Sequence, residues 1–264
     1  MYLRRKEIIN CIIALSFYAF MFLIIGSSFV LYVSAFVYSS VHPNVEYADL
    51  ITALAGLADF NQMSPELLKG YSIVGSYGQL ITYTITTAFV LIFMWKHLVR
   101  DFKDLWNNIL KFILVVFVSF ILFYIVTLVV ELTISLIVKQ ESTNQESIVY
   151  LITNGGAIPM FISVVILAPL LEELIYRKAI FTLFENKPII LPYIVSALVF
   201  SIPHMLSTQA DFGTWVLLLI PYLTSGFLLA GVYHASGKNV WASWAIHAAN
   251  NFIAYVGIIL LMQM

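Results

Sequence analysis

Charged side chains are scarce in this 264-residue sequence, where Asp, Glu, Lys and Arg together make up 10% of the residues. A soluble globular chain carries about a quarter charged residues and roughly half apolar ones. Here apolar residues reach 61%, and the mean hydropathy is +0.95. The net charge is only −1, and the sequence has neither a basic stripe nor a glycine-rich phosphate loop. These absences exclude an ordinary soluble domain and give no support to a nucleic-acid partner.

Cysteine is almost absent as well. Cys11 is the only one, so a framework of intrachain disulfides is excluded. The N-terminus also lacks a clear small-residue cleavage site after its basic start at Arg4, Arg5 and Lys6. The apolar run that follows, 8–38, is longer than the apolar region of a signal peptide. We therefore expect a retained first helix.

Long apolar runs dominate the rest of the chain. In hydrocarbon the backbone of each run must satisfy its own hydrogen bonds, so each run is expected to be a helix. The sequence thus predicts an all-α, polytopic transmembrane bundle of about seven helices, with an eighth if a partial segment near 149–156 forms its own helix. The run from 157 is longer than a bilayer requires, so we expect it to tilt, to kink at Pro169 or to end in an amphipathic segment. The seven runs are 8–36, 79–98, 109–138, 157–184, 189–206, 214–234 and 241–262.

The distribution of Lys and Arg predicts the orientation. Two of these residues, Lys69 and Lys139, fall on one side of the expected bundle. Nine fall on the other side: Arg4, Arg5, Lys6, Lys96, Arg100, Lys103, Lys111, Lys187 and Lys238. Cytoplasmic loops are enriched in Lys and Arg, so the N-terminus is expected in the cytoplasm and, with seven helices, the C-terminus outside. An eighth helix would reverse the side of the C-terminus.

The 39–78 connection is the one long loop that this pattern predicts, and it falls on the outer side. Its amphipathic stretch, Ala48 to Phe60, is predicted to be an interfacial helix or a lid. A solvated loop with some helix explains the same residues equally well.

Ionisable side chains inside an apolar run are functional candidates because burying them in the bilayer costs several kcal/mol. The run 157–184 carries Glu172 and Glu173 near its middle. Adjacent positions on a helix face different directions, whereas Glu173 and Arg177 are four residues apart in the favourable order for an ion pair. We expect that pair to form, which leaves Glu172 available as a general base.

Two later runs supply histidines. Phe200 precedes His204 by four residues, and His247 precedes Asn251 by four, so each pair shares a helix face. Counted along the helices from the cytoplasmic connections, Glu172, both histidines and Asn251 lie about 13–25 Å deep. A lone intramembrane histidine is more often a satisfied core residue, but three polar clusters at similar depth favour one shared site. Glu131 stands alone in its run, and we assign it to a structural hydrogen bond or to the outer interface.

The order Glu-Glu-x-x-x-Arg, Phe-x-x-x-His, His-x-x-x-Asn closely resembles the CPBP family, the CAAX proteases and bacteriocin-processing enzymes that are also called the Abi or type II CAAX endopeptidase family. The resemblance covers about 165–255. We therefore divide the chain into N-terminal transmembrane helices with a long external loop, 1–150, and a CPBP-like catalytic core, 151–264. Two departures are Tyr176, where Phe is usual, and Lys178, where a small residue often follows the Arg. Lys178 is expected to alter packing or substrate charge near the site.

The resemblance implies an intramembrane endopeptidase that uses activated water. It assigns roles to seven residues: Glu172 as the base with His204 beside it, His247 and Asn251 as stabilisers of the oxyanion, Glu173 and Arg177 as supports of the geometry, and Phe200 as a cavity wall. A zinc ion would take Glu172, His204 and His247 as ligands. The sequence has no His-Glu-x-x-His helix, so we favour a mechanism without a metal or another cofactor.

Other functions explain parts of the sequence. A non-catalytic scaffold that regulates another membrane protein is the main alternative, but it has no need of this polar set. A proton-coupled transporter is a weaker one, because inverted repeats are not visible. The expected partners are the lipid bilayer and a peptide or protein substrate that enters from the membrane. A prenylated CAAX protein and a bacteriocin or pheromone leader both fit, and we favour a leader in a bacterial or archaeal plasma membrane.

Overall fold

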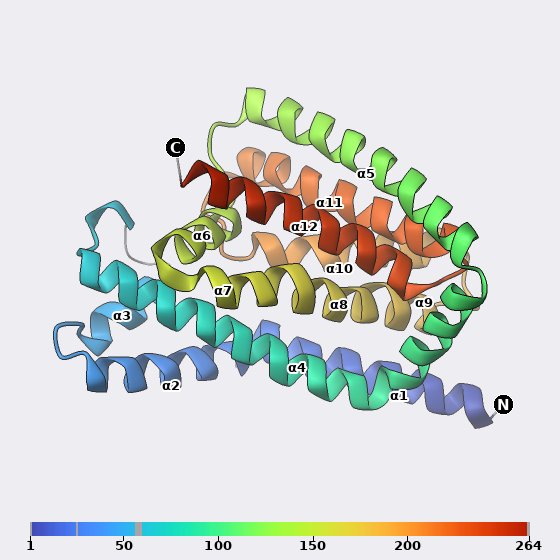
Figure 1. Cartoon of the computed structure of the whole chain (residues 1–264), viewed down its shortest axis with the longest axis horizontal. Coiled ribbons are helices and arrows are strands. Elements are labelled where there is room, and N and C mark those ends of the chain that lie inside the picture. The colour runs from blue at the N-terminus through green and yellow to red at the C-terminus, as the bar shows by residue number, and fades with distance from the viewer. Residues whose placement is uncertain (1, 25, 56–59, 263–264) are drawn as a thin grey trace.

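The structure, a computed structural model (Figure 1), describes residues 2–24, 26–55 and 60–262. Within these ranges no residue is in a strand. The predicted all-α polytopic bundle is therefore confirmed. The α-helices are α1 (Tyr2–Ala19), α2 (Gly26–Val41), α3 (Tyr47–Leu54), α4 (Pro65–Asn107), α5 (Ile109–Ile137), α6 (Thr143–Leu151), α7 (Ala157–Met160), α8 (Ala168–Glu172), α9 (Ile180–Leu183), α10 (Ile190–Met205), α11 (Phe212–Ala235) and α12 (Val240–Leu261). Wide π-helical turns occur at Phe20–Ile24, Ile152–Gly156, Phe161–Leu167 and Glu173–Ala179.

The outer surface of the bundle is apolar. Helix α5 has large side chains that face away from the protein, among them Leu110, 82% exposed, and Leu136, 78% exposed. Such a surface is unfavourable in water but is solvated by lipid tails. In the described part of the chain, six helical stretches are long and apolar enough to span a membrane, and α10 is a shorter apolar helix. The protein is therefore an integral membrane protein.

The N-terminal helices differ from the predicted pattern. The expected first run is split into α1 and α2, which both pack against α4, and α1 also contacts the turn Glu173–Ala179 (Figure 1). Helix α4 has 43 residues, so the predicted run 79–98 is only its middle part. It begins early because the Ser64 side chain accepts a hydrogen bond from the amide of Leu67 and Pro65 occupies the first turn. The predicted 39–78 loop is accordingly too long.

The predicted interfacial helix in this loop is partly present. Helix α3 forms eight residues of it, and Leu50 and Ala53 are buried against the neighbouring helices. Residues 56–59, which belong to the predicted stretch Ala48 to Phe60, lie outside the described residues.

The central helix of the bundle is one bent stretch, 143–183, built from α6 to α9. It bends at Asn154 and at Gly155, whose φ of 108° favours glycine, and both residues lie before the predicted run 157–184. A π-helical turn, Phe161–Leu167, ends two residues before Pro169. Gly156, the residue after the bend, packs so closely that a Cβ atom there would lie 2.6 Å from the Cβ of Ser76. Helix α6 has nine residues and a length of about 14 Å, too short for a separate crossing.

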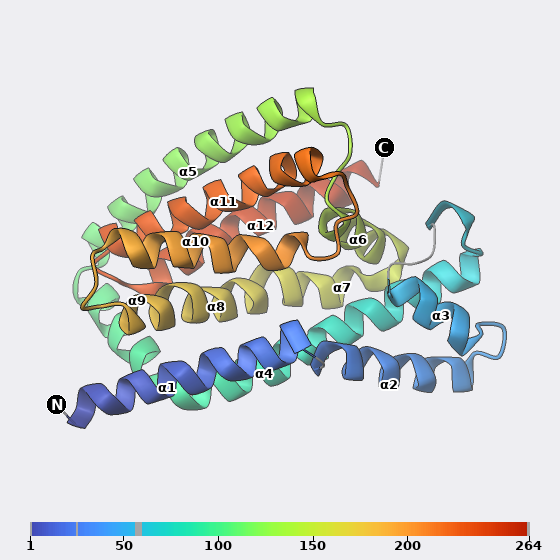
Figure 2. The same cartoon turned by 180° about the vertical axis from the view of Figure 1, so that it is seen from behind.

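The two ends of the bundle differ in their charge. At one end Arg4 donates hydrogen bonds to Glu185 at 3.2 Å and to Asn186 at 2.7 Å, and Asn239 donates one to the carbonyl of Asp101 at 2.7 Å. These contacts bring the N-terminus close to the α4–α5, α9–α10 and α11–α12 connections. The nine Lys and Arg residues lie in or beside these segments, and we call this end of the bundle the basic end. The opposite end holds α3, α6 and the C-terminal end of α12 (Figure 2).

Candidate active site

The two adjacent glutamates lie on the central helix, where residues 171–180 are all buried. Glu173 is completely enclosed. One of its oxygens, Oε1, accepts hydrogen bonds from Arg177 Nη1 at 2.9 Å and from His247 Nδ1 at 3.0 Å. The ion pair expected from the four-residue spacing is confirmed. Glu173 thereby links the central helix to α12.

Arg177 extends this link to α10 and α11. Its Nη2 donates a hydrogen bond to the carbonyl of Gly226 at 3.3 Å, and its guanidinium carbon lies 4.8 Å from the centre of the Phe200 ring. Helices α10 and α11 are in close contact at this level, because a Cβ atom on Gly226 would lie 2.9 Å from the Cα of Ala197. Arg177 therefore holds together the helices that carry the polar side chains.

His247 lies between the two glutamates. While its Nδ1 contacts Glu173, its Nε2 lies 3.9 Å from Oε2 of Glu172. A hydrogen bond to the buried carboxylate requires the proton on Nδ1, so in the neutral imidazole Nε2 carries the lone pair. That nitrogen is then the one that can exchange a proton with groups beside Glu172. Glu172 itself is 4% exposed.

His204 reaches the same region from the end of α10. Its Nδ1 donates a hydrogen bond to the carbonyl of Phe200 at 2.8 Å, and its ring stacks on Tyr222 with the ring centres 4.9 Å apart. These contacts fix the orientation of the imidazole and leave Nε2 for a ligand or for water.

Phe200 lies behind these side chains rather than in the cavity wall, where it had been expected. Its ring centre is 5.0 Å from that of His204 and 5.6 Å from that of His247. It also makes an edge contact with Tyr176. Phe200 therefore packs the two histidines against the central helix.

Asn251 is held apart from the other predicted residues. Its Nδ2 donates a hydrogen bond to the carbonyl of Val164 at 2.8 Å. Val164 lies in the π-helical turn Phe161–Leu167, where the widened turn changes the usual backbone hydrogen bonds. In this structure the amide group stabilises that turn.

A cavity of about 340 Å³ adjoins the glutamate. Glu172 and His204 line it, and neither His247 nor Asn251 is among its lining residues. Much of the wall comes from the N-terminal helices, including Tyr18 of α1 and Tyr83 of α4. Neither tyrosine could be predicted from the sequence, because residues 1–150 carry no motif that would single them out.

Both departures from the family pattern have partners in these N-terminal helices. The hydroxyl of Tyr176 is hydrogen-bonded to that of Tyr18. Lys178 is 3% exposed and donates to both carboxylate oxygens of Asp101, at 2.6 and 2.8 Å. The charge of Lys178 is thus compensated within the protein, and Lys178 acts on packing rather than on the charge of the cavity.

The structure does not bring together the three residues that were considered as zinc ligands, Glu172, His204 and His247. Within residues 2–24, 26–55 and 60–262, no three His, Cys, Asp or Glu side chains lie where they could share a metal ion. Glu172 and His247 approach each other, but His204 does not complete a group with them. We therefore derive no step through a metal.

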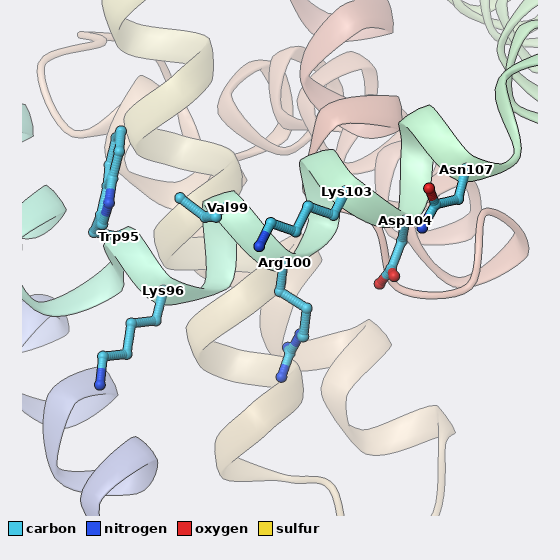
Figure 3. A pocket seen from close by; sticks show the side chains of 7 residues that line it. All are labelled: Trp95, Lys96, Val99, Arg100, Lys103, Asp104 and Asn107. Atoms are coloured by element: carbon cyan, nitrogen blue, oxygen red, sulfur yellow. The ribbon is translucent and has the colours of Figure 1, made fainter.

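A second hollow lies on the surface of α4 near the basic end (Figure 3). It has a volume of about 550 Å³, and its lining contains no residue of the predicted site. The seven residues that line it all belong to α4: Trp95, Lys96, Val99, Arg100, Lys103, Asp104 and Asn107.

Comparison with known proteins points to the part of the chain that carries the three motifs. The family described as type II CAAX prenyl endopeptidase Rce1-like matches residues 154–253, which include all three motifs. An uncharacterized protein of Mycoplasma capricolum subsp. capricolum (strain California kid) is 34% identical over 125 residues, which cover 45% of this chain and 35% of that protein. The chain thus aligns with about a third of the length of this relative. No solved structure matches the chain significantly. The resemblance inferred from the motifs is confirmed, because residues 154–253 match the family model described as type II CAAX prenyl endopeptidase Rce1-like.

Proposed function

We propose that this protein is an intramembrane endopeptidase in which Glu172 is the general base. The observation that carries the proposal is the unequal environment of two neighbouring carboxylates. Glu173 binds Arg177 and His247 at 2.9 and 3.0 Å, whereas Glu172 lies 3.9 Å from Nε2 of His247 and lines the cavity together with His204. A base must reach water and the substrate, and of the two carboxylates Glu172 meets that condition.

The proposed reaction begins with a water molecule between Glu172 and the carbonyl carbon of the scissile peptide bond. Glu172 takes a proton from the water while the oxygen attacks the carbon, so a tetrahedral intermediate with a negative oxygen forms. The proton then passes to the amide nitrogen as the C–N bond breaks, which releases an amine and a carboxylic acid. Nε2 of His204, at the cavity wall, is positioned to share this proton transfer.

The oxyanion requires donors that are already in place. Such donors are typically worth about 3–4 kcal/mol each. His247 is the nearest candidate, since its Nε2 lies 3.9 Å from Glu172. It becomes a donor in the proposed reaction once Nε2 has taken up a proton, because in the neutral imidazole this nitrogen carries the lone pair. Asn251 can take this role only if its amide exchanges the carbonyl of Val164 for the oxyanion. The N-terminal helices, which supply Tyr18 and Tyr83, complete the cavity in this proposal.

The test is the substitution Glu172→Gln. It retains the shape of the side chain but removes the charge that accepts a proton, so turnover should fall by roughly 10²–10⁴-fold. The melting temperature in detergent should be retained, because a neutral amide is cheaper to bury than a carboxylate. The measurement is cleavage of a library of peptide precursors by purified protein, with the products identified by mass spectrometry.

The matched control is Glu131→Gln on α5, where the carboxylate is exposed and lies outside the site. This variant should cleave at the wild-type rate. If Glu172→Gln also cleaves at the wild-type rate, Glu172 is not the base. If neither variant nor the wild-type protein cleaves any peptide, the scaffold alternative gains support.

A further inference from the structure

The hollow on the surface of α4 lies outside the candidate active site and is lined by side chains of this one helix (Figure 3). Its three basic side chains, Lys96, Arg100 and Lys103, are spaced four and three residues apart, so they share one face of the helix. Trp95 lies at one end of the row and is 59% exposed. The hollow thus combines an exposed aromatic ring with a row of three cations.

The exposed apolar side chains on either side of the hollow place it at the edge of the membrane. Ile92, four residues before Lys96, is 73% exposed, and Leu110 in the first turn of α5 is 82% exposed. Lipid tails solvate such side chains, so both helices meet hydrocarbon close to the hollow. From Lys96 to Asn107, every residue that lines the hollow is charged or polar except Val99. Basic side chains next to an exposed Trp are typical of the level of the lipid headgroups.

Two of the three cations are available to a ligand. Arg100 is engaged within the protein, since its Nη1 lies 3.9 Å from Glu7 and its Nε lies 3.6 Å from Asp101. The ammonium groups of Lys96 and Lys103 are different. In residues 2–24, 26–55 and 60–262, neither of them has a hydrogen-bond or ion-pair partner. The hollow therefore holds two uncompensated positive charges at the level of the headgroups.

The charge of the lining is complementary to an anion. Asp104 is the one carboxylate among the lining residues, against three cations. We propose that this hollow binds an anionic phospholipid whose headgroup phosphate contacts Lys96 and Lys103. The ammonium group of lysine binds phosphate as a point charge. An acyl chain of the same lipid lies along Trp95 and Ile92, which a free phosphate ion would leave uncovered.

The size of the hollow also fits a lipid. Its volume of about 550 Å³ is larger than an inorganic phosphate ion requires. The row from Lys96 to Lys103 is about 10 Å long at 1.5 Å per residue, which suits a headgroup that lies along the helix. The site does not depend on the proposed endopeptidase activity, because none of its residues lines the cavity at Glu172.

Native mass spectrometry of the purified protein in detergent tests the proposal. Phosphatidylglycerol is the anionic probe, and zwitterionic phosphatidylcholine is the comparison. The wild-type protein should bind phosphatidylglycerol at lower concentrations than phosphatidylcholine. One Lys near an anionic headgroup contributes about fivefold to affinity, so the double variant Lys96→Gln/Lys103→Gln should need roughly 30-fold more phosphatidylglycerol for half-occupancy.

Two further double variants serve as controls. Lys111→Gln/Lys187→Gln removes the same charge from exposed positions of the basic end that lie outside the hollow. Lys96→Arg/Lys103→Arg retains both charges of the hollow. Both should bind phosphatidylglycerol as the wild type does. If Lys96→Gln/Lys103→Gln fails to fold, each single substitution should weaken binding about fivefold.

Three results would overturn the proposal. Equal weakening of binding in Lys96→Gln/Lys103→Gln and in Lys111→Gln/Lys187→Gln would show that the charge of the whole basic end attracts the lipid. Binding of phosphatidylcholine at the same concentrations as phosphatidylglycerol, or no binding of either, would show that the hollow does not select an anionic headgroup. Displacement of phosphatidylglycerol by inorganic phosphate would identify the ligand as the free ion. Because binding is measured without a substrate, these results leave the test of Glu172 unaffected.

Discussion

At the scale of single residues, two adjacent carboxylates have different surroundings and therefore different roles in the proposed mechanism. Glu172 and Glu173 are adjacent, so they leave the helix in different directions. The side chain of Glu173 enters the protein, where Arg177 and His247 compensate its charge at 2.9 and 3.0 Å. The side chain of Glu172 reaches the cavity. In the proposed mechanism, a single helical step thus separates a structural carboxylate from the general base.

Loss of Arg177 should destabilise the protein as well as inactivate it. Arg177→Ala leaves Glu173 without its main partner in a fully buried position, and removal of one partner of a buried pair costs about 3–5 kcal/mol. We expect a lower melting temperature and a lower yield in detergent together with lost cleavage. Glu172→Gln, in contrast, should lose cleavage alone. An Arg177→Ala protein that melts with the wild type would show that the pair is not needed for the fold.

Part of this residue-level arrangement could be predicted and part could not. The Glu173–Arg177 pair follows from a four-residue spacing within one helix, so local geometry was sufficient. The pair of Lys178 with Asp101 joins positions 77 residues apart, and only the packing of α4 against the central helix brings them together. The bond of Asn251 to Val164 depends on a π-helical turn, which no pattern in the residues predicts.

At the scale of helices, apolar runs identified most crossings but misplaced the N-terminal ones. The first turns of α4 contain small and polar residues, such as Ser72 and Ser76, which lower the local hydropathy. These side chains face the protein rather than lipid, and Ser72 donates a hydrogen bond to the carbonyl of Leu151 at 2.7 Å. A hydropathy pattern cannot distinguish a polar residue that packs against protein from one that ends a helix. For this reason α4 was predicted too short.

The contact between α10 and α11 should tolerate no added atoms at Gly226. Gly226→Ala places a Cβ atom 2.9 Å from the backbone of Ala197, and overpacking of this kind typically costs about 1–3 kcal/mol. The shift should also move the carbonyl that accepts from Arg177, so both melting temperature and cleavage should fall.

Gly231→Ala, on the same helix, is the matched control for this substitution. A Cβ atom at Gly231 would have no neighbour within 4 Å, so this variant should be neutral or slightly stabilised. Equal melting temperatures for the two variants would contradict the close approach of α10 and α11.

At the scale of the whole molecule, charged side chains are almost absent from the wall of the cavity. Among the described residues that line it, Glu172 is the only carboxylate and none is Lys or Arg. Nine of the basic residues lie at the basic end, Lys69 and Lys139 lie toward the opposite end, and Arg177 and Lys178 are paired in the interior. The cavity is therefore suited to an uncharged stretch of peptide whose charged termini remain outside it.

This distribution predicts how the position of a free carboxylate affects cleavage. In a C-terminal CaaX tail the carboxylate stands three residues after the cysteine, close enough to enter the cavity with the scissile bond. The carboxylate would find no Lys or Arg side chain in the cavity wall and would lie near Glu172. An unsatisfied buried polar group costs about 1–3 kcal/mol, or more if it is charged.

The test compares two forms of any peptide that the protein cleaves, both ending three residues after the scissile bond. The form with an amidated C-terminus should be cleaved with a kcat/KM roughly ten- to a hundredfold higher than the form with a free C-terminal carboxylate. When about ten further residues separate the scissile bond from the C-terminus, the carboxylate remains in water and the two forms should be cleaved alike. Faster cleavage of the short free acid would mean that a cation reaches the site and that the natural substrate is a C-terminal tail.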